Sequence, residues 1–122
     1  MKFLIALFAF AMITASTFAA DGPVRHIVHF KFKASATKEQ IAKIVEEFAA
    51  LKGKISVVES LEWGTNVSKE GLDKGFDYCW LVTFKNEADR DAYIVHPAHQ
   101  AFVELLKPIL EEPMVVDFIP QK

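Results

Sequence analysis

The segment from Asp77 to Phe84 constrains the fold most, because it is short, strand-like and apolar on both faces. From Tyr78 onward its residues are almost all aromatic, aliphatic or β-branched, without regular polar alternation. Such a run predicts a strand that is covered on both faces, either by a central place in a sheet or by contact with another molecule. The rest of the chain must therefore supply neighbours for it on more than one side.

The flanking patterns predict the order strand, helix, strand, strand, helix, strand. Strands are expected over 24–33, 55–67, 77–84 and 115–119, helices over 37–53, 86–93 and 97–110, and a surface loop over 68–75. Thr37 followed by Gln40 is a capping box, and Asn86 is expected to cap the second helical region. Gly64 is expected to mark a bulge or a bend in the second strand.

The last helix is expected to start at Pro97 and to be stopped by Pro113. Glu111 and Glu112 are then expected to lie at its end, before the final strand.

This order is the ferredoxin-like βαββαβ pattern of an α+β protein with a four-stranded antiparallel sheet. Helices shelter only one face of such a sheet. In the first strand one face carries His26, Val28, Phe30 and Phe32, and the other carries Arg25, Ile27, His29, Lys31 and Lys33. Ile27, Cys79 and Leu81 make the second face too apolar for water, so two sheets packed face to face, and hence a homodimer, are expected.

The N-terminus has the pattern of a cleaved signal peptide. Phe3 to Ile13 is an unbroken apolar run, shorter than the roughly twenty residues of a membrane-spanning helix. Small residues follow it and favour cleavage after Ala19, with Ala20 as the second choice. Residues 1–19 are therefore expected to be a signal peptide, and residues 20–122 to be one exported domain, periplasmic or extracellular. The alternative is a buried or amphipathic first helix.

Charge and composition exclude several classes of partner. The formal net charge is −2, and removing Lys2 leaves −3, so neither nucleic acid nor an anionic membrane surface is expected as a partner. Cys79 is the single cysteine, which rules out an intrachain disulfide and favours a buried thiol over a reactive or intermolecular one. No phosphate-binding glycine loop or nucleophile elbow occurs, and no cofactor is expected.

Four motifs resemble a known family. They are HIVHFKFK at 26–33, WGTNVS at 63–68, YIVHPAH at 93–99 and VDF at 116–118. In this order they resemble the stress-responsive A/B barrel (Dabb) domain over essentially the whole mature chain. The resemblance implies a dimeric α+β barrel in which two four-stranded sheets close on each other, but no single chemistry.

One branch of this family, the olivetolic acid cyclase type, catalyses an aldol condensation. The resemblance places the tyrosine and the second histidine of that branch's motif on Tyr93 and His99. A histidine can act as the base, and a tyrosine hydroxyl can stabilise the enolate oxygen. The pocket, between the helices and the sheet of each subunit, would be lined by His26, Phe30, Phe48, Leu51, Tyr78 and Trp80. Trp80 and Tyr78 replace smaller residues of the cyclase pocket, which weakens the prediction that this chain catalyses the same reaction.

The paired histidines do not predict a metal site. His26 and His29 point to opposite faces of a strand. His96 and His99 lack a third ligand, and are expected instead to fix the turn between two helices, one of them by bonding free backbone groups there. Asp117, an acid in an apolar strand, is expected to pair with a lysine or arginine, or to face the dimer rim.

Two functions stay open at this point. The preferred one is an exported homodimer that is non-catalytic or binds a small apolar ligand. The alternative is a cofactor-independent enzyme, polyketide cyclase-like or monooxygenase-like, that uses Tyr93 and His99. A pocket filled by Trp80 would weaken the prediction of an enzyme and favour the preferred function.

Overall fold

The computed structural model describes residues 22–122, so the expected signal peptide lies outside the described residues. The elements are β1 (Val24–Phe32), α2 (Lys38–Lys54), β2 (Ser60–Thr65), β3 (Tyr78–Phe84), α3 (Glu87–Val95), α4 (Pro97–Leu106), a short 3-10 helix η1 (Lys107–Ile109) and β4 (Leu110–Phe118). Within residues 22–122, no helix combines the length and apolarity needed to cross a bilayer.

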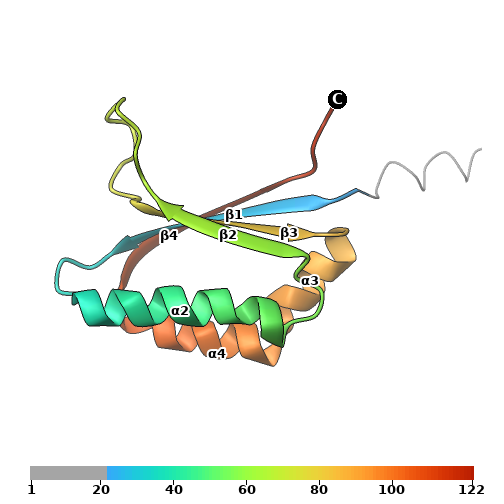
Figure 1. Cartoon of the computed structure of the whole chain (residues 1–122), viewed down its shortest axis with the longest axis horizontal. Coiled ribbons are helices and arrows are strands. Elements are labelled where there is room, and N and C mark those ends of the chain that lie inside the picture. Colours follow the sequence, from blue (N-terminus) through green and yellow to red (C-terminus); the bar gives the residue numbers. More distant parts are fainter. Residues whose placement is uncertain (1–21) are drawn as a thin grey trace, which may run out of the picture.

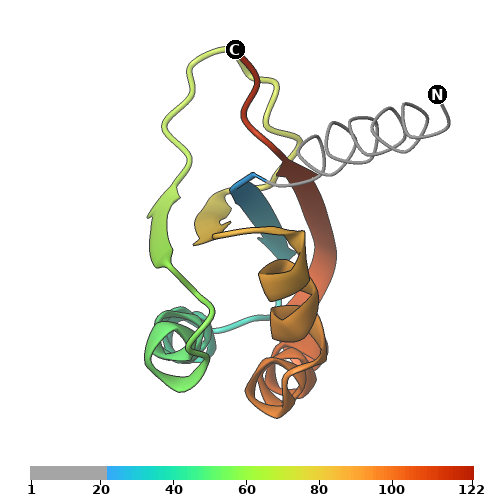
Figure 2. The same ribbon diagram turned by 90° about the vertical axis from the view of Figure 1, so that its right-hand side faces the viewer.

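The four strands form one antiparallel sheet in the order β2-β3-β1-β4, which confirms the ferredoxin-like prediction. All three α-helices lie on one side of the sheet, and the loop between β2 and β3 rises on the other side (Figures 1 and 2). β3 lies between β1 and β2. Its side chains on the helix side, Trp80, Val82 and Phe84, are buried, whereas Cys79 and Leu81 on the other face are partly exposed in a single chain.

The core fills the space between the sheet and the helices. Helix α2 begins with the predicted capping box, in which Thr37 and Gln40 bond each other's backbone N–H groups. Its apolar stripe brings Phe48 against Trp80 of β3, with the two rings stacked at 4.8 Å and 10°. Trp80 is fully buried, and Phe30 packs on it with ring centroids 4.8 Å apart. The centre of the subunit is therefore solid aromatic packing.

The second strand is shorter than predicted. β2 begins at Ser60, and the preceding apolar residues Ile55 and Val58 are buried in a turn rather than paired in the sheet. Burial of a turn produces the same apolar pattern as a strand, so the pattern alone could not separate them. Of the bulge or bend predicted at Gly64, the bulge is wrong, because Gly64 pairs with Cys79 without a change of register.

The prediction for the last helix and strand is also wrong in its bounds. The helical region ends at η1, and β4 begins at Leu110, so Glu111, Glu112 and Pro113 lie inside the strand. Pro113 pairs with Phe30 of β1. A strand at the sheet edge tolerates proline, since the missing N–H can face outward where no neighbour needs it.

The face of the sheet away from the helices, called the outer face below, is apolar at its centre. Ile27 lies directly between Leu81 of β3 and Val116 of β4. Met114, Val116 and Phe118 are 41%, 51% and 46% exposed. The described residues of one chain leave this surface open.

Candidate functional site

The turn between α3 and α4 holds the tyrosine and histidine that the family resemblance singled out. Tyr93 lies in the last turn of α3, and His99 lies in the first turn of α4, which begins at Pro97. His96 caps α4, its Nδ1 accepting from the Ala98 N–H at 3.0 Å. His99 Nδ1 donates to the Ile94 carbonyl at 3.0 Å. The expectation that these histidines fix the turn, one of them by bonding its backbone groups, is confirmed, and in the structure both of them make such a bond.

The rings of Tyr93 and His99 lie against each other, with centroids 4.5 Å apart. Tyr93 is 1% exposed, and burial raises the pKa of its hydroxyl well above the ordinary value. Burial also lowers the pKa of His99, which favours the neutral imidazole. Because Nδ1 carries the proton shared with Ile94, the free lone pair of neutral His99 is on Nε2. The structure thus places the protonated hydroxyl-bearing ring of Tyr93 against the neutral imidazole of His99.

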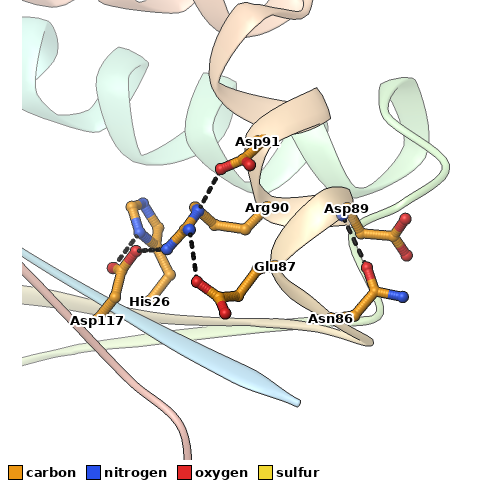
Figure 3. Close-up of polar contacts among 7 residues, drawn as sticks. All are labelled: His26, Asn86, Glu87, Asp89, Arg90, Asp91 and Asp117. Carbon is orange, nitrogen blue, oxygen red and sulfur yellow. Dashed lines mark hydrogen bonds and ion pairs between the residues drawn. The ribbon is translucent and has the colours of Figure 1, made fainter. Parts of the chain in front are cut away.

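A charged network lies beside this pair. His26 Nδ1 donates to Asp117 Oδ1 at 2.7 Å, and Arg90 Nη1 donates to Asp117 Oδ2 at 2.7 Å (Figure 3). The side chain of His26 is 8% exposed and that of Asp117 is 24% exposed, so the three groups are largely screened from water. This confirms the expected pairing of Asp117 with an arginine. The sequence patterns revealed neither Arg90 nor the contact with His26 in advance.

Arg90 forms ion pairs with more than one carboxylate. It also bonds Asp91 at 2.9 Å and Glu87 at 3.4 Å, and its hydrogen bond with Asp117 is the largest cause of a raised pKa for the guanidinium. The His26 ring also packs edge-on against Tyr93, with ring centroids 5.7 Å apart. The network therefore fixes the orientation of a buried imidazole that faces the tyrosine.

The residues expected to line a ligand pocket form the packed core instead of an open cavity. Phe30, Phe48, Leu51 and Trp80 are each at most 3% exposed, and Tyr78 stacks on Trp80 at 6.3 Å. Trp80 Nε1 is buried without a hydrogen-bond partner. The ligand-binding role of these residues stays a prediction.

A hollow of about 700 Å³ lies on the outer face, under the loop between β2 and β3. Leu72, Phe76 and Leu81 supply part of its apolar lining. His29 also lines it, with its ring edge-on to Phe76 at 6.4 Å and with Nδ1 buried and unpaired. The opposite placement of His26 and His29 on the two faces is as expected.

No group of three or more histidine, cysteine, aspartate or glutamate side chains in residues 22–122 is arranged to hold a metal ion. The thiol of Cys79 was expected to be buried, and the structure places it half-buried on the sheet. Burial raises the pKa of this thiol.

Comparison with known proteins identifies relatives over most of the chain. The chain is 32% identical over 101 residues to the stress-response A/B barrel domain-containing protein HS1 of Arabidopsis thaliana, covering 83% of this chain and 93% of that protein. It is 27% identical over 99 residues to olivetolic acid cyclase of Cannabis sativa, covering 81% of this chain and 98% of the cyclase.

Two solved structures share the fold. The hydroxynitrile lyase of Passiflora edulis superposes with a TM-score of 0.78 at 25% identity, covering 84% of this chain and 96% of the lyase. A dimeric protein of unknown function from Bacteroides fragilis, described as having a ferredoxin-like fold, superposes with a TM-score of 0.66 at 29% identity, covering 81% of this chain and 97% of that chain.

The family model of the stress responsive A/B barrel domain matches residues 24–120, which span every described strand and helix. The order of the strands and the placement of the motifs at 26–33, 63–68, 93–99 and 116–118 agree with that match. The chain belongs to the stress-responsive A/B barrel domain family.

Proposed function

We propose that this protein is exported and acts as a homodimer whose role is non-catalytic. The observation that carries the proposal is the contrast between the two faces of the sheet. The inner face is covered by helices and solidly packed, whereas Ile27, Leu81 and Val116 leave the outer face apolar and open. A second copy presenting the same face would remove both patches from water at once.

Dimer formation is supported by the relative from Bacteroides fragilis, which is described as dimeric. The proposed dimer is a closed assembly, because a twofold axis pairs the outer face of one copy with the outer face of the other, and no outer face remains for a third copy. It also encloses the hollow beneath the loop between β2 and β3.

A non-catalytic role is supported by the filling of the subunit interior. Trp80 is fully buried between Phe48 and Phe30, so a substrate would have to displace core side chains to lie between the sheet and the helices. Export is supported by the apolar run and small residues before the domain.

The test is sedimentation velocity combined with native mass spectrometry on protein purified from its own cells. We expect twice the chain mass at micromolar concentration, and an intact mass that matches cleavage after Ala19. A monomer at that concentration, with wild-type folding, would remove the basis for pairing through the outer face. A retained N-terminus would contradict export through a cleaved signal. The same spectra test the expected small apolar ligand, which would add its mass to the native dimer and not to the denatured chain.

A second candidate function is an acid–base enzyme without a cofactor, supported by the contact of Tyr93 with neutral His99 beside the fixed ring of His26. Two relatives, the cyclase and the lyase, are named as enzymes. In hydroxynitrile cleavage, His99 Nε2 would take the hydroxyl proton as the C–CN bond breaks. The carbonyl would form, and cyanide would leave and then be protonated. The Tyr93 hydroxyl would donate a hydrogen bond to the reacting oxygen.

The assay is release of benzaldehyde from mandelonitrile at mildly acidic pH, followed by its absorbance. An enzyme of this type should lose activity in both Tyr93→Phe and His99→Gln, by about 10²-fold or more. Wild-type turnover no faster than buffer would eliminate this reaction.

A further inference from the structure

Arg25 and Glu62 place opposite charges on the outer face of the sheet. Arg25 and Ile27 are two residues apart on β1, so their side chains project to the same face. Glu62 of β2 is paired with Leu81 of β3, and Leu81 is paired with Ile27, which places Glu62 on that face too. Helices α2, α3 and α4 lie on the opposite side of the sheet (Figure 2). The two charges therefore belong to the surface that the proposed dimer would bury.

Neither of these charges has an ion-pair partner within residues 22–122. The other two charged side chains at paired strand positions of the outer face, Lys31 and Glu112, form an ion pair at 3.7 Å. Strand β3 lies between β1 and β2, and Arg25 and Glu62 pair neither with each other nor with another described residue. Arg25 is half-buried and Glu62 is exposed in a single chain, so water can solvate both.

Burial of the outer face changes the balance for both charges. A charge that is taken out of water without an opposite charge beside it is strongly destabilising. In a face-to-face dimer, Arg25 and Glu62 would both lose water, and their own chain offers neither of them a partner. Compensation must therefore come from the second copy.

We propose that Arg25 of each subunit forms an ion pair with Glu62 of the partner subunit. This inference rests on the proposed homodimer and specifies how its two sheets are aligned. A twofold axis makes every contact between two different residues reciprocal, so one arrangement pairs both charges of both chains. The guanidinium group suits this role, because it can donate two parallel hydrogen bonds to one carboxylate.

The pairing also determines where the twofold axis passes. The axis must lie over the midpoint between Arg25 and Glu62, because it exchanges the two members of each ion pair. Arg25 is paired with Thr83 and Glu62 with Leu81, so this midpoint falls on β3 between Thr83 and Leu81. The Leu81 side chains of the two copies would then lie close to the axis. The ion pairs are therefore compatible with burial of the apolar centre of the outer face, which includes Ile27.

Charge reversal tests the pairing. Arg25→Glu and Glu62→Arg each place two pairs of like charges across the dimer interface, and each should raise the dimer Kd on the order of 100-fold in sedimentation equilibrium at low salt. The double variant Arg25→Glu/Glu62→Arg exchanges the charges and should return the Kd close to the wild-type value. Glu46→Arg reverses an exposed charge on α2, on the helical side, and is the matched control that should dimerise like the wild type.

A mixture of the two single variants gives a second readout. A dimer of one Arg25→Glu chain and one Glu62→Arg chain contains two ion pairs, whereas each variant alone contains two repulsive contacts. Native mass spectrometry of the mixture should therefore show heterodimers at a concentration at which each variant alone is monomeric. The two chains differ in mass, so heterodimers and homodimers are distinguished directly.

An unchanged Kd in both single variants would overturn the pairing, as would failure of the double variant and of the mixture to dimerise. Circular dichroism verifies that each variant is folded. Leu81→Asp separates this inference from the proposed dimer. If Leu81→Asp dissociates the dimer and the charge reversals do not, the outer faces pair in another alignment and only this inference fails. A monomeric wild type would remove the homodimer and the ion pairs together.

Discussion

Leu81 offers the sharpest test of what the outer face does. Its partners in register are Ile27 on one side and Glu62 on the other, and it is partly exposed in a single chain. Leu81→Asp should therefore cost the isolated fold only about 1 kcal/mol. In a face-to-face dimer the same change places one unpaired carboxylate from each subunit in an apolar interface. At about 3 kcal/mol for each such charge, the total is about 6 kcal/mol, which raises the dimer Kd by about four powers of ten.

Sedimentation equilibrium over a dilution series measures this change, and urea unfolding monitored by circular dichroism verifies that the monomer remains folded. The matched control is Val95→Asp, since Val95 is 69% exposed at the end of α3 on the helical side. We expect the control to dimerise like the wild type. A Leu81→Asp dimer with an unchanged Kd, or equal dissociation of both variants, would refute pairing through the outer face.

Three further predictions concern the interior and the candidate site. Trp80→Ala should lower the free energy of unfolding by about 4 kcal/mol in urea titrations, whereas Trp63→Ala, at a position 45% exposed, should cost about 1 kcal/mol. Asp117→Ala should lower the free energy of unfolding by about 2–3 kcal/mol, which is less than for a fully buried ion pair because Asp117 is 24% exposed. A double-mutant cycle with Arg90→Ala measures the coupling between the two side chains, and a coupling near zero would contradict the network. Folding lowers the pKa of His99 from its ordinary value of 6.5, so at mildly acidic pH the unfolded chain binds more protons than the folded chain. The free energy of unfolding of the wild type should therefore fall as pH drops from 7 toward 5. His99→Asn should show a shallower fall in thermal melts across that range, and an identical pH profile would show that His99 does not contribute.

The order of the elements could be predicted because most of them carry their own local signal. The capping box at Thr37 and the cap at Asn86 mark helix starts within a few residues of sequence. The two-sided apolar pattern of Tyr78 to Phe84 implied a sheet that needed cover on both faces. These signals come from residues that are close together in the chain, so they can be identified from the sequence alone.

The bounds of the last strand could not be predicted, because they depend on tertiary position. Pro113 stops a helix in most contexts, and nothing local indicates that its strand lies at a sheet edge. The pairing of Asp117 with Arg90, 27 positions away, likewise depends on how the fold brings α3 and the end of β4 within reach of each other. Family resemblance pointed to Tyr93 and His99, whereas the hollow on the outer face became visible only with the strand register and the path of the loop between β2 and β3.

Pro113 also affects how copies of this protein can meet. A sheet can recruit another sheet along its edge, where free N–H groups template a further strand, or across its face. Edge-to-edge addition that repeats head to tail does not close and leads to fibres, whereas facing sheets close on a twofold axis. With a proline in β4, the donor row of that open edge is interrupted, and the free strand is a poor template for growth. A backbone position that misled the assignment of the last helix thus makes the β4 edge a poor template for a further strand, whereas the outer face keeps an apolar surface for association across the sheet.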